Sequence, residues 1–141
     1  MQITGNTILI TGGGSGIGRA LAQAFHALGN KVIISGRRAD VLKEVAAANP
    51  GMAWATMDAT DAEGIKAFAD RLIADHPDLN AVINNAGIMK NEDIKAAPTY
   101  LDTAEETIAT NLLAPIRLTA ALLPHFLTKP KATVLTVSSG L

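Results

Sequence analysis

The sequence contains no cysteine, which excludes disulfide bonds, thiolate catalysis and cysteine-ligated metal sites. It also lacks an excess of charge of either sign, because 12 Lys and Arg residues stand against 13 Asp and Glu residues, for a formal net charge of −1. Proteins that bind nucleic acid or membrane surfaces usually carry a basic excess, so we expect neither partner. The three histidines, His26, His76 and His125, are scattered and give little support for a metal site.

Long uninterrupted hydrophobic runs are also missing. The start, MQITGNTILITGGG, has no basic stretch followed by a long apolar one, so we expect no signal peptide. The most apolar stretch, residues 111–127, is broken by Pro115, Arg117, Pro124 and His125 and makes a poor membrane span. With 48% hydrophobic and 18% charged residues, the composition is globular, and we expect one cytoplasmic domain over residues 1–141.

Short β-rich runs alternate with helical patterns along the whole sequence. The predicted strands are Thr7–Thr11, Lys31–Ser35, Ala53–Asp58, Ala81–Asn84 and Thr133–Val137. Their apolar cores are continuous, which is typical of strands covered on both faces of a sheet. The alternation predicts βαβ units in an α/β fold with a parallel sheet. Right-handed crossovers favour the strand order 3-2-1-4-5 of a Rossmann-like, doubly wound sheet.

Helix limits are predicted from apolar periodicity and capping residues. The first helix, between the first two strands, is expected to carry an apolar stripe of Ile17, Leu21, Ala24, Phe25 and Leu28. The second is predicted near Asp40–Ala48, with Asp40 as its N-cap. Capping-box patterns begin at Thr60 and Thr103. They predict a third helix that ends near Asp75 and a fourth that continues to Phe126.

A glycine-rich turn, TGGGSGIG at residues 11–18, follows the first predicted strand and opens the first helix. Gly12, Gly16 and Gly18 have the spacing G-x-x-x-G-x-G rather than the strict G-x-G-x-x-G. Small residues let the backbone approach a diphosphate, and free N–H groups at a helix start attract its charge. In this strand–turn–helix context the pattern favours a nucleotide site over a turn that merely needs flexible residues.

The second predicted strand ends without the acidic residue that NAD-binding sites usually place there. It reads ISGRR, with Arg37 and Arg38 and no carboxylate before Asp40. A guanidinium can bind phosphate through two N–H groups, so this pattern favours the 2′-phosphate of NADP. Two alternatives stay open: the arginines are simply solvated at a loop, or Asp40 binds the ribose, although helix capping explains Asp40 better.

Four motifs occur in the order and spacing of the short-chain dehydrogenase/reductase family. They are TGGGSGIG at 11–18, NNAG at 84–87, TIATNLLAPIRLTAALLP at 107–124 and VLTVSS at 134–139. The whole chain resembles the amino-terminal, cofactor-binding part of that family. The resemblance implies an oxidoreductase that interconverts a small-molecule alcohol and carbonyl by hydride transfer. It also implies NADP as cofactor, with NAD as the alternative, and a homo-oligomer.

The same resemblance implies roles for individual residues. At the cofactor it implies Gly12, Ser15, Gly16, Ile17 and Gly18 for the phosphates, Arg37 and Arg38 for the 2′-phosphate, Asp58 and Ala59 for the adenine, and Asn85, Ala86 and Gly87 for the adenosine ribose. Asn84 would tie neighbouring strands together. Asn111 and Ser139 would be two members of the catalytic Asn–Ser–Tyr–Lys set, although Ser138 competes with Ser139 and either can be a loop hydroxyl. NNAG can also be a tight turn, and Asp58 a turn cap.

Pro115 lies four residues after Asn111 in the same predicted helix. Because proline has no N–H, the carbonyl of Asn111 is left without its helical donor. In the family that carbonyl is thought to hold a water molecule of the proton relay. An ordinary proline kink is the alternative.

The Tyr-x-x-x-Lys pair of the family does not occur in this sequence. The single tyrosine, Tyr100, precedes Ser139 and is followed four positions later by Ala104. We therefore expect a chain that lacks the family's carboxyl-terminal strands and helices, is inactive by itself and belongs to a longer enzyme. The alternative is a non-catalytic dinucleotide-binding module or remnant. In either case Thr133–Val137 would be a bare edge strand.

Overall fold

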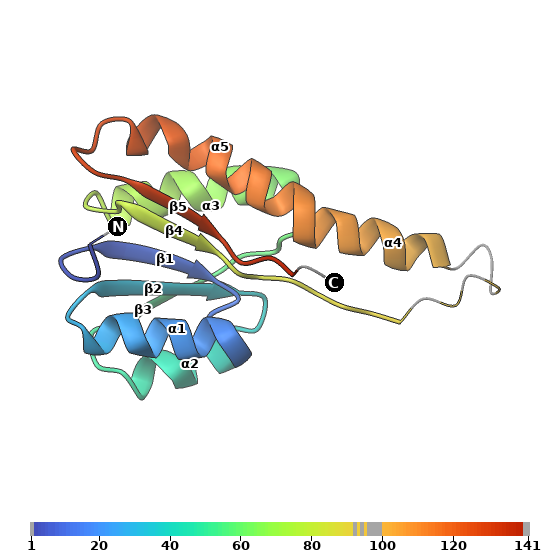
Figure 1. Cartoon of the computed structure of the whole chain (residues 1–141), viewed down its shortest axis with the longest axis horizontal. Coiled ribbons are helices and arrows are strands. Elements are labelled where there is room, and N and C mark those ends of the chain that lie inside the picture. Colours follow the sequence, from blue (N-terminus) through green and yellow to red (C-terminus); the bar gives the residue numbers. More distant parts are fainter. Residues whose placement is uncertain (1, 92, 94, 96–99, 140–141) are drawn as a thin grey trace.

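A five-stranded parallel sheet forms the centre of the computed structural model, which describes residues 2–91, 93, 95 and 100–139 (Figure 1). The strands are β1 (Thr7–Thr11), β2 (Lys31–Gly36), β3 (Ala53–Thr56), β4 (Ala81–Asn84) and β5 (Thr133–Thr136). They lie in the order β3-β2-β1-β4-β5, which confirms the predicted Rossmann-like topology. β2 runs one residue further than predicted, and β3 ends at Thr56 rather than Asp58.

Helices cover both faces of the sheet. They are α1 (Gly16–Ala27), α2 (Ala39–Ala47), α3 (Ala62–Asp75), α4 (Tyr100–Ile108), the π-helical η1 (Ala109–Leu113) and α5 (Ala114–Phe126). In Figure 1, α1 and α2 lie on one face, whereas α3 and α5 lie on the other. From Tyr100 to Phe126 the chain is continuously helical, and α4 extends beyond the carboxyl ends of the strands.

The central strands have two buried faces, which accounts for their uninterrupted apolar runs. Along β1, Ile8 and Ile10 belong to the hydrophobic cluster that contains Leu42 of α2. Leu9, between them, belongs to the opposite cluster, which contains Phe68 of α3 and Leu118 of α5. Successive side chains of a strand point to opposite faces, so both helical layers are held by the same short run of residues.

β5 is an edge strand that pairs with β4 alone. Its apolar run led us to expect burial on both faces, but Val134 and Leu135 are 44% and 41% exposed. The expectation of burial is wrong for this strand, and the bare edge is present in the described part of the chain.

Three predicted helix starts are wrong by a few residues. α3 is capped by Asp61, whose side chain accepts a hydrogen bond from the amide of Gly64 at 3.0 Å, and not by Thr60. Arg38 rather than Asp40 is the N-cap residue of α2, and Asp40 lies in the first turn. α4 already begins at Tyr100, so Thr103 lies inside the helix and does not cap it.

The predicted apolar stripe of α1 is only partly correct. Leu21 and Phe25 pack against the core, and Ala22 is fully buried. Ile17 is 65% exposed and Leu28 is exposed as well. Both lie near the ends of the helix, and Ile17 in the first turn faces a cavity rather than the sheet.

The helical segment Leu101–Phe126 is long and apolar enough to cross a membrane, judged by length and composition alone. In this structure α5 packs along α3 and buries Leu118, Leu122 and Phe126 in the core. A helix with one apolar stripe packed on a sheet is the ordinary core helix of an α/β protein. The absence of a membrane partner stays a prediction.

The neighbours Leu122 and Leu123 provide a matched test of this packing, because Leu122 is fully buried and Leu123 is 45% exposed. We expect Leu122→Ala to lower the free energy of unfolding by about 2–5 kcal/mol through lost contacts and a residual cavity. Leu123→Ala is expected to change it by only about 0.5 kcal/mol or less. Urea unfolding of both variants checks this, and equal losses would contradict the packing of α5.

Candidate functional site

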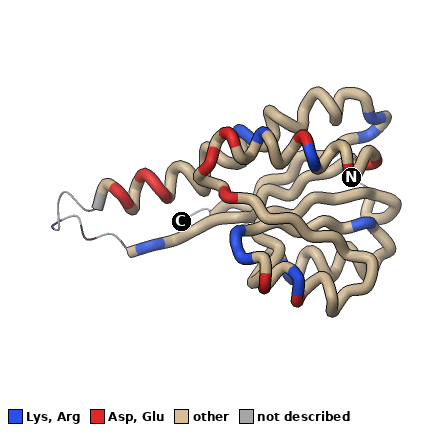
Figure 2. The backbone as a smooth tube through the Cα atoms, turned by 180° about the vertical axis from the view of Figure 1, so that it is seen from behind, with Lys and Arg blue, Asp and Glu red and all other residues tan. Residues whose placement is uncertain are grey.

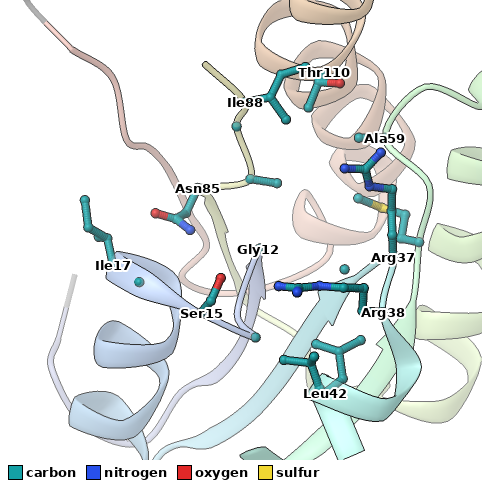
Figure 3. A pocket seen from close by; sticks show the side chains of 17 residues that line it. Gly12, Ser15, Ile17, Arg37, Arg38, Leu42, Ala59, Asn85, Ile88 and Thr110 are labelled. Atoms are coloured by element: carbon teal, nitrogen blue, oxygen red, sulfur yellow. The ribbon is translucent and has the colours of Figure 1, made fainter. Parts of the chain in front are cut away.

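A cavity of about 590 Å³ opens where the strands of the sheet end (Figure 3). Its walls come from the ends of β1, β2, β3 and β4 and the segments that follow them, from the first turns of α1 and α2, and from Thr110 of η1. Ligands of open parallel sheets bind at this place, and the volume suits a small molecule. The predicted cofactor residues that line the cavity are Gly12, Ser15, Gly16, Ile17, Arg37, Arg38, Ala59, Asn85, Ala86 and Gly87.

Four predicted site residues are not among those that line the cavity. They are Gly18, Asp58, Asn111 and Ser139. The lining residues that sequence reasoning missed are Gly14, Gly36, Val41, Leu42, Met57, Ile88 and Thr110. Most of these are apolar or lack a side chain, so their chemistry alone does not mark them as site residues. Except for Thr110, which lies in η1, they share a position at or shortly after the end of a strand, or in the first turn of the following helix.

The bend between β1 and α1 is packed so closely that two of its glycines have no room for a side chain. A Cβ atom on Gly18 would lie 2.3 Å from the carbonyl oxygen of Gly12. A Cβ atom on Gly12, whose φ is +69°, would lie 2.9 Å from the Cα atom of Ala86. The glycines therefore allow the first turn of α1, the bend and the segment after β4 to meet.

The amide groups of the bend fall into two sets. Those of Gly12 and Gly13 donate to the carbonyl of Ser35 at 2.8 and 3.2 Å, so they are not available to a ligand. Those of residues 14–18 donate to no group among the described residues outside regular helix bonds. Ser15 is the N-cap of α1, yet its side chain makes no capping bond, although capping is the usual function of a serine there. The helix start thus keeps free N–H donors, of the kind that bind anions at helix N-termini.

Thr11, a buried residue at the end of β1, joins the bend to the NNAG segment. Its hydroxyl oxygen accepts hydrogen bonds from the amides of Asn85 and Ala86, each at 3.0 Å. In return, the side-chain amide of Asn85 donates to the carbonyl of Thr11 at 3.1 Å. These bonds hold the two sides of the cavity in register, and sequence reasoning did not assign Thr11 any such role.

Asn84 precedes this junction. The resemblance implied that it ties neighbouring strands together, but its side-chain nitrogen donates to the hydroxyl of Thr119 on α5 at 3.2 Å. The side chain therefore connects β4 to a helix rather than to another strand.

The two arginines after β2 extend in different directions. In Figure 3 the guanidinium of Arg38 reaches across the cavity towards Ser15, whereas that of Arg37 points to the side where Ala59 and Thr110 lie. Nη1 of Arg37 is 3.9 Å from Oε1 of Glu106 on α4. Both arginines line the cavity, and their contact with a 2′-phosphate stays a prediction.

Asp58 takes part in the turn after β3. Its Oδ1 atom accepts hydrogen bonds from the amide and the hydroxyl of Thr60, at 2.9 and 2.7 Å. These bonds, assisted by the positive charge of Arg37, hold the pKa of Asp58 below its usual value of 3.8. The turn-capping alternative is therefore realised, and the contact of Asp58 with adenine stays a prediction.

Asn111 lies in η1, the π-helical turn between α4 and α5. The amide of Ala114 donates to the carbonyl of Ala109, five residues back, and Pro115 follows directly. Single π turns inside α-helices occur often at functional sites. The side chain of Asn111 binds both backbone groups of Ile88, accepting from its amide at 2.8 Å and donating to its carbonyl at 2.7 Å. Ser139 is exposed after β5, and its catalytic role stays a prediction.

The sequence pattern of the short chain dehydrogenase family matches residues 6–141, and the chain belongs to this family. An uncharacterized oxidoreductase of Bacillus subtilis (strain 168), DltE, is 38% identical over 141 residues, which are 100% of this chain and 56% of that protein. The chain therefore spans about half the length of the relatives that it matches.

Solved structures agree with this assignment. A short-chain dehydrogenase from Streptomyces avermitilis superposes with a TM-score of 0.86 at 31% identity, covering 96% of this chain and 50% of the other. A metagenomic short-chain oxidoreductase, solved in complex with NADP, gives a TM-score of 0.82 at 27% identity, covering 97% of this chain and 62% of the other. Members of the family are NAD(P)-dependent oxidoreductases.

Gly18 and Gly36 allow a matched test of the close packing in the bend. We expect Gly18→Ala to lower the free energy of unfolding by about 1–3 kcal/mol, because its Cβ meets backbone. The Cβ of Gly36→Ala would have only Leu42 within reach, at 3.8 Å, and is expected to be tolerated. Chemical denaturation measures both, and an unchanged Gly18→Ala variant would show that the bend is looser than described.

The turn at Asp58 predicts a dependence on pH. Because its pKa is lowered on folding, this carboxylate stabilises the protein above pH 3.8, and the contribution is lost as the pH falls through the lowered value. Thr60→Val removes the hydroxyl bond but keeps the amide bond, so the pKa of Asp58 should rise part of the way towards 3.8. Thr60→Ser is the control that retains the hydroxyl. An NMR titration of the carboxyl carbon follows each variant; an identical pKa in all three would exclude a role for the hydroxyl.

Proposed function

We propose that the cavity binds NADP(H) and that the chain is the cofactor-binding part of an oxidoreductase that interconverts an alcohol and a carbonyl. The observation that carries this proposal is the bend after β1, where an N-cap serine makes no capping bond and the amides of residues 14–18 are left for a ligand. A diphosphate is an anion with several acceptor oxygens, which suits such a row of donors.

The lining of the cavity supports this proposal with open space beside the free amides and with apolar and cationic side chains. A Cβ atom on Gly16 would have nothing within 4 Å, so a ligand has space to approach the backbone there, and the two apolar side chains of Val41 and Leu42 lie near the arginines, where an adenine ring can pack. When bound, the nicotinamide supplies or accepts the hydride. The residues of this chain bind and orient the cofactor, and the Asn111 side chain fixes the backbone at Ile88 on the cavity wall.

The preference for NADP over NAD is proposed from Arg37 and Arg38. Both line the cavity, and no carboxylate stands at the end of β2 to bind a free ribose hydroxyl. A charged hydrogen bond to the 2′-phosphate contributes about 1.5–3 kcal/mol. This corresponds to a preference of roughly one to two orders of magnitude in the dissociation constant.

Hydride transfer to a carbonyl also needs an acid at the substrate oxygen. Ser139 and Asn111 are proposed as members of the catalytic set, but the 141 residues contain no Tyr-x-x-x-Lys, since Tyr100 is followed by Ala104. We therefore propose that these residues by themselves bind cofactor and do not turn over substrate. A dinucleotide-binding module without catalysis is the second candidate, favoured by the same missing pair.

The remaining proposals concern partners and location. We propose a small-molecule alcohol or carbonyl substrate, a cytoplasmic location and a homo-oligomer. The oligomer is supported by the apolar side chains that α4, η1 and α5 expose, among them Ile108, Leu112 and Ile116. Exposed apolar patches on a helix face commonly mark protein–protein contacts.

Titration of NADPH and NADH against the purified protein tests the cofactor proposal. We expect NADPH to bind about 10- to 100-fold more tightly than NADH. Arg37→Asp should remove most of this difference, because it replaces the phosphate-binding cation with an anion. Arg71→Asp makes the same change of charge at an exposed position of α3 outside the cavity and should preserve it. Equal affinities for the two dinucleotides, unaffected by Arg37→Asp, would refute the preference.

A further inference from the structure

An acidic side chain of α4 lies next to the arginine that is proposed to bind the 2′-phosphate. Oε1 of Glu106 is 3.9 Å from Nη1 of Arg37, and the Glu106 side chain is 29% exposed against 61% for Arg37. Glu106 precedes Thr110 by four residues on the same continuous helix, so the two lie on one side of it. Thr110 lines the cavity, which places Glu106 at its rim, on the side towards which Arg37 points (Figure 3).

The two oxygens of this carboxylate face two different cations. Oε2 accepts a hydrogen bond from Nζ of Lys90, which lies on the extended segment after β4. α4 runs back alongside that segment in Figure 1, and Figure 2 shows acidic residues on the helix and a basic residue on the segment. Glu106 therefore bridges three parts of the chain: α4, the end of β2 and the segment after β4.

The two contacts differ in kind. Lys90 is hydrogen-bonded to Glu106, whereas the 3.9 Å between Arg37 and Glu106 exceeds hydrogen-bond distance. The guanidinium of Arg37 is thus held by charge attraction alone, and its N–H groups are not bonded to the carboxylate. Such a guanidinium can rotate to bind another anion, but it then loses its electrostatic attraction to the Glu106 carboxylate.

We propose that Glu106 determines how strongly the site selects a phosphorylated adenosine ribose. The inference rests on the proposed function of Arg37 as the 2′-phosphate ligand. Without cofactor, Glu106 competes for Arg37; with cofactor, its negative charge lies close to the phosphate and opposes it. NADH has no 2′-phosphate, so its binding does not displace Arg37 from Glu106. Glu106 therefore lowers the selectivity that Arg37 and Arg38 would otherwise produce.

Competition for Arg37 and repulsion of the 2′-phosphate both weaken the binding of NADPH, and both effects are modest in size. Pairs of exposed charges contribute little because water screens them, and breaking such a pair corresponds to a change in affinity of about 1.4- to 5-fold. Glu106→Gln keeps the size of the side chain and one acceptor oxygen while it removes the charge. We expect this variant to bind NADPH about twofold to fivefold more tightly than the unmodified protein, with unchanged affinity for NADH.

The test measures dissociation constants of NADPH and NADH, and of adenosine 2′,5′-bisphosphate and AMP as probes of the phosphate alone. Glu105→Gln is the matched control, since it removes the same charge from the neighbouring exposed position of α4. Only Glu106→Gln should raise the affinity for NADPH relative to the affinity for NADH. In an Arg37→Met background, Glu106→Gln should raise it less, because no guanidinium is left to release.

Lys90→Gln provides a second variant of opposite sign. Without the ammonium group, the Glu106 carboxylate interacts with Arg37 alone and attracts it more strongly. The selectivity for NADPH should therefore fall. The thermal midpoint of each variant shows that it is folded. A merely structural role for Glu106 in holding α4 would lower that midpoint and change both affinities equally.

Several outcomes overturn the inference. These are an unchanged NADPH:NADH ratio in Glu106→Gln, an equal rise in Glu105→Gln, or a ratio that does not fall in Lys90→Gln. Such results in a protein that still prefers NADPH would leave the proposed function intact. An unmodified protein that binds neither dinucleotide, or both equally, would overturn the proposed function and this inference together.

Discussion

The close contact between the bend after β1 and the segment after β4 is the constraint on which the site depends. Gly12 and Gly18 are pressed against backbone, so the first turn of α1 can begin directly beneath the cavity. Thr11 and Asn85 then fix the two segments by reciprocal hydrogen bonds. If either side moved outward, the amides of residues 14–18 would shift relative to the segment after β4, and the proposed anion site would be lost.

Strand order and location of the site could be predicted from the sequence because both follow from local patterns. Apolar runs such as TILIT identify the buried strands, and the strand–turn–helix context of TGGGSGIG identifies the ligand side of the sheet. Helix starts were harder, because neighbouring polar residues compete for the same amides. Thr60 matched a capping box, but its hydroxyl binds Asp58, and Asp61 caps α3 instead.

What could not be predicted depends on contacts between residues far apart in sequence. Val41, Leu42 and Met57 line the cavity only because three successive strand ends come together there, and apolar residues of this kind look like core in the sequence. The burial predicted for β5 failed for a related reason. An apolar run shows that a strand can be covered on both faces, but not whether the described chain supplies the cover, and Val134 stays exposed. Glu106 belongs to the same group, since nothing near it in sequence points to Arg37.

The charge of the chain explains why such single contacts matter. A net charge of −1 gives no general attraction for an anionic cofactor, so affinity has to arise from a few donors at close range. In the bend after β1 these donors are backbone amides, and the Ser15 side chain does not occupy them. At the end of β2 they are flexible guanidinium groups, and Arg37 lies within reach of an acidic neighbour. In the proposed dinucleotide site, backbone geometry would therefore determine binding of the pyrophosphate, whereas competition between side chains would determine binding of the adenosine end. Selectivity between the two dinucleotides is accordingly the property that single substitutions can change most readily without disturbing the fold.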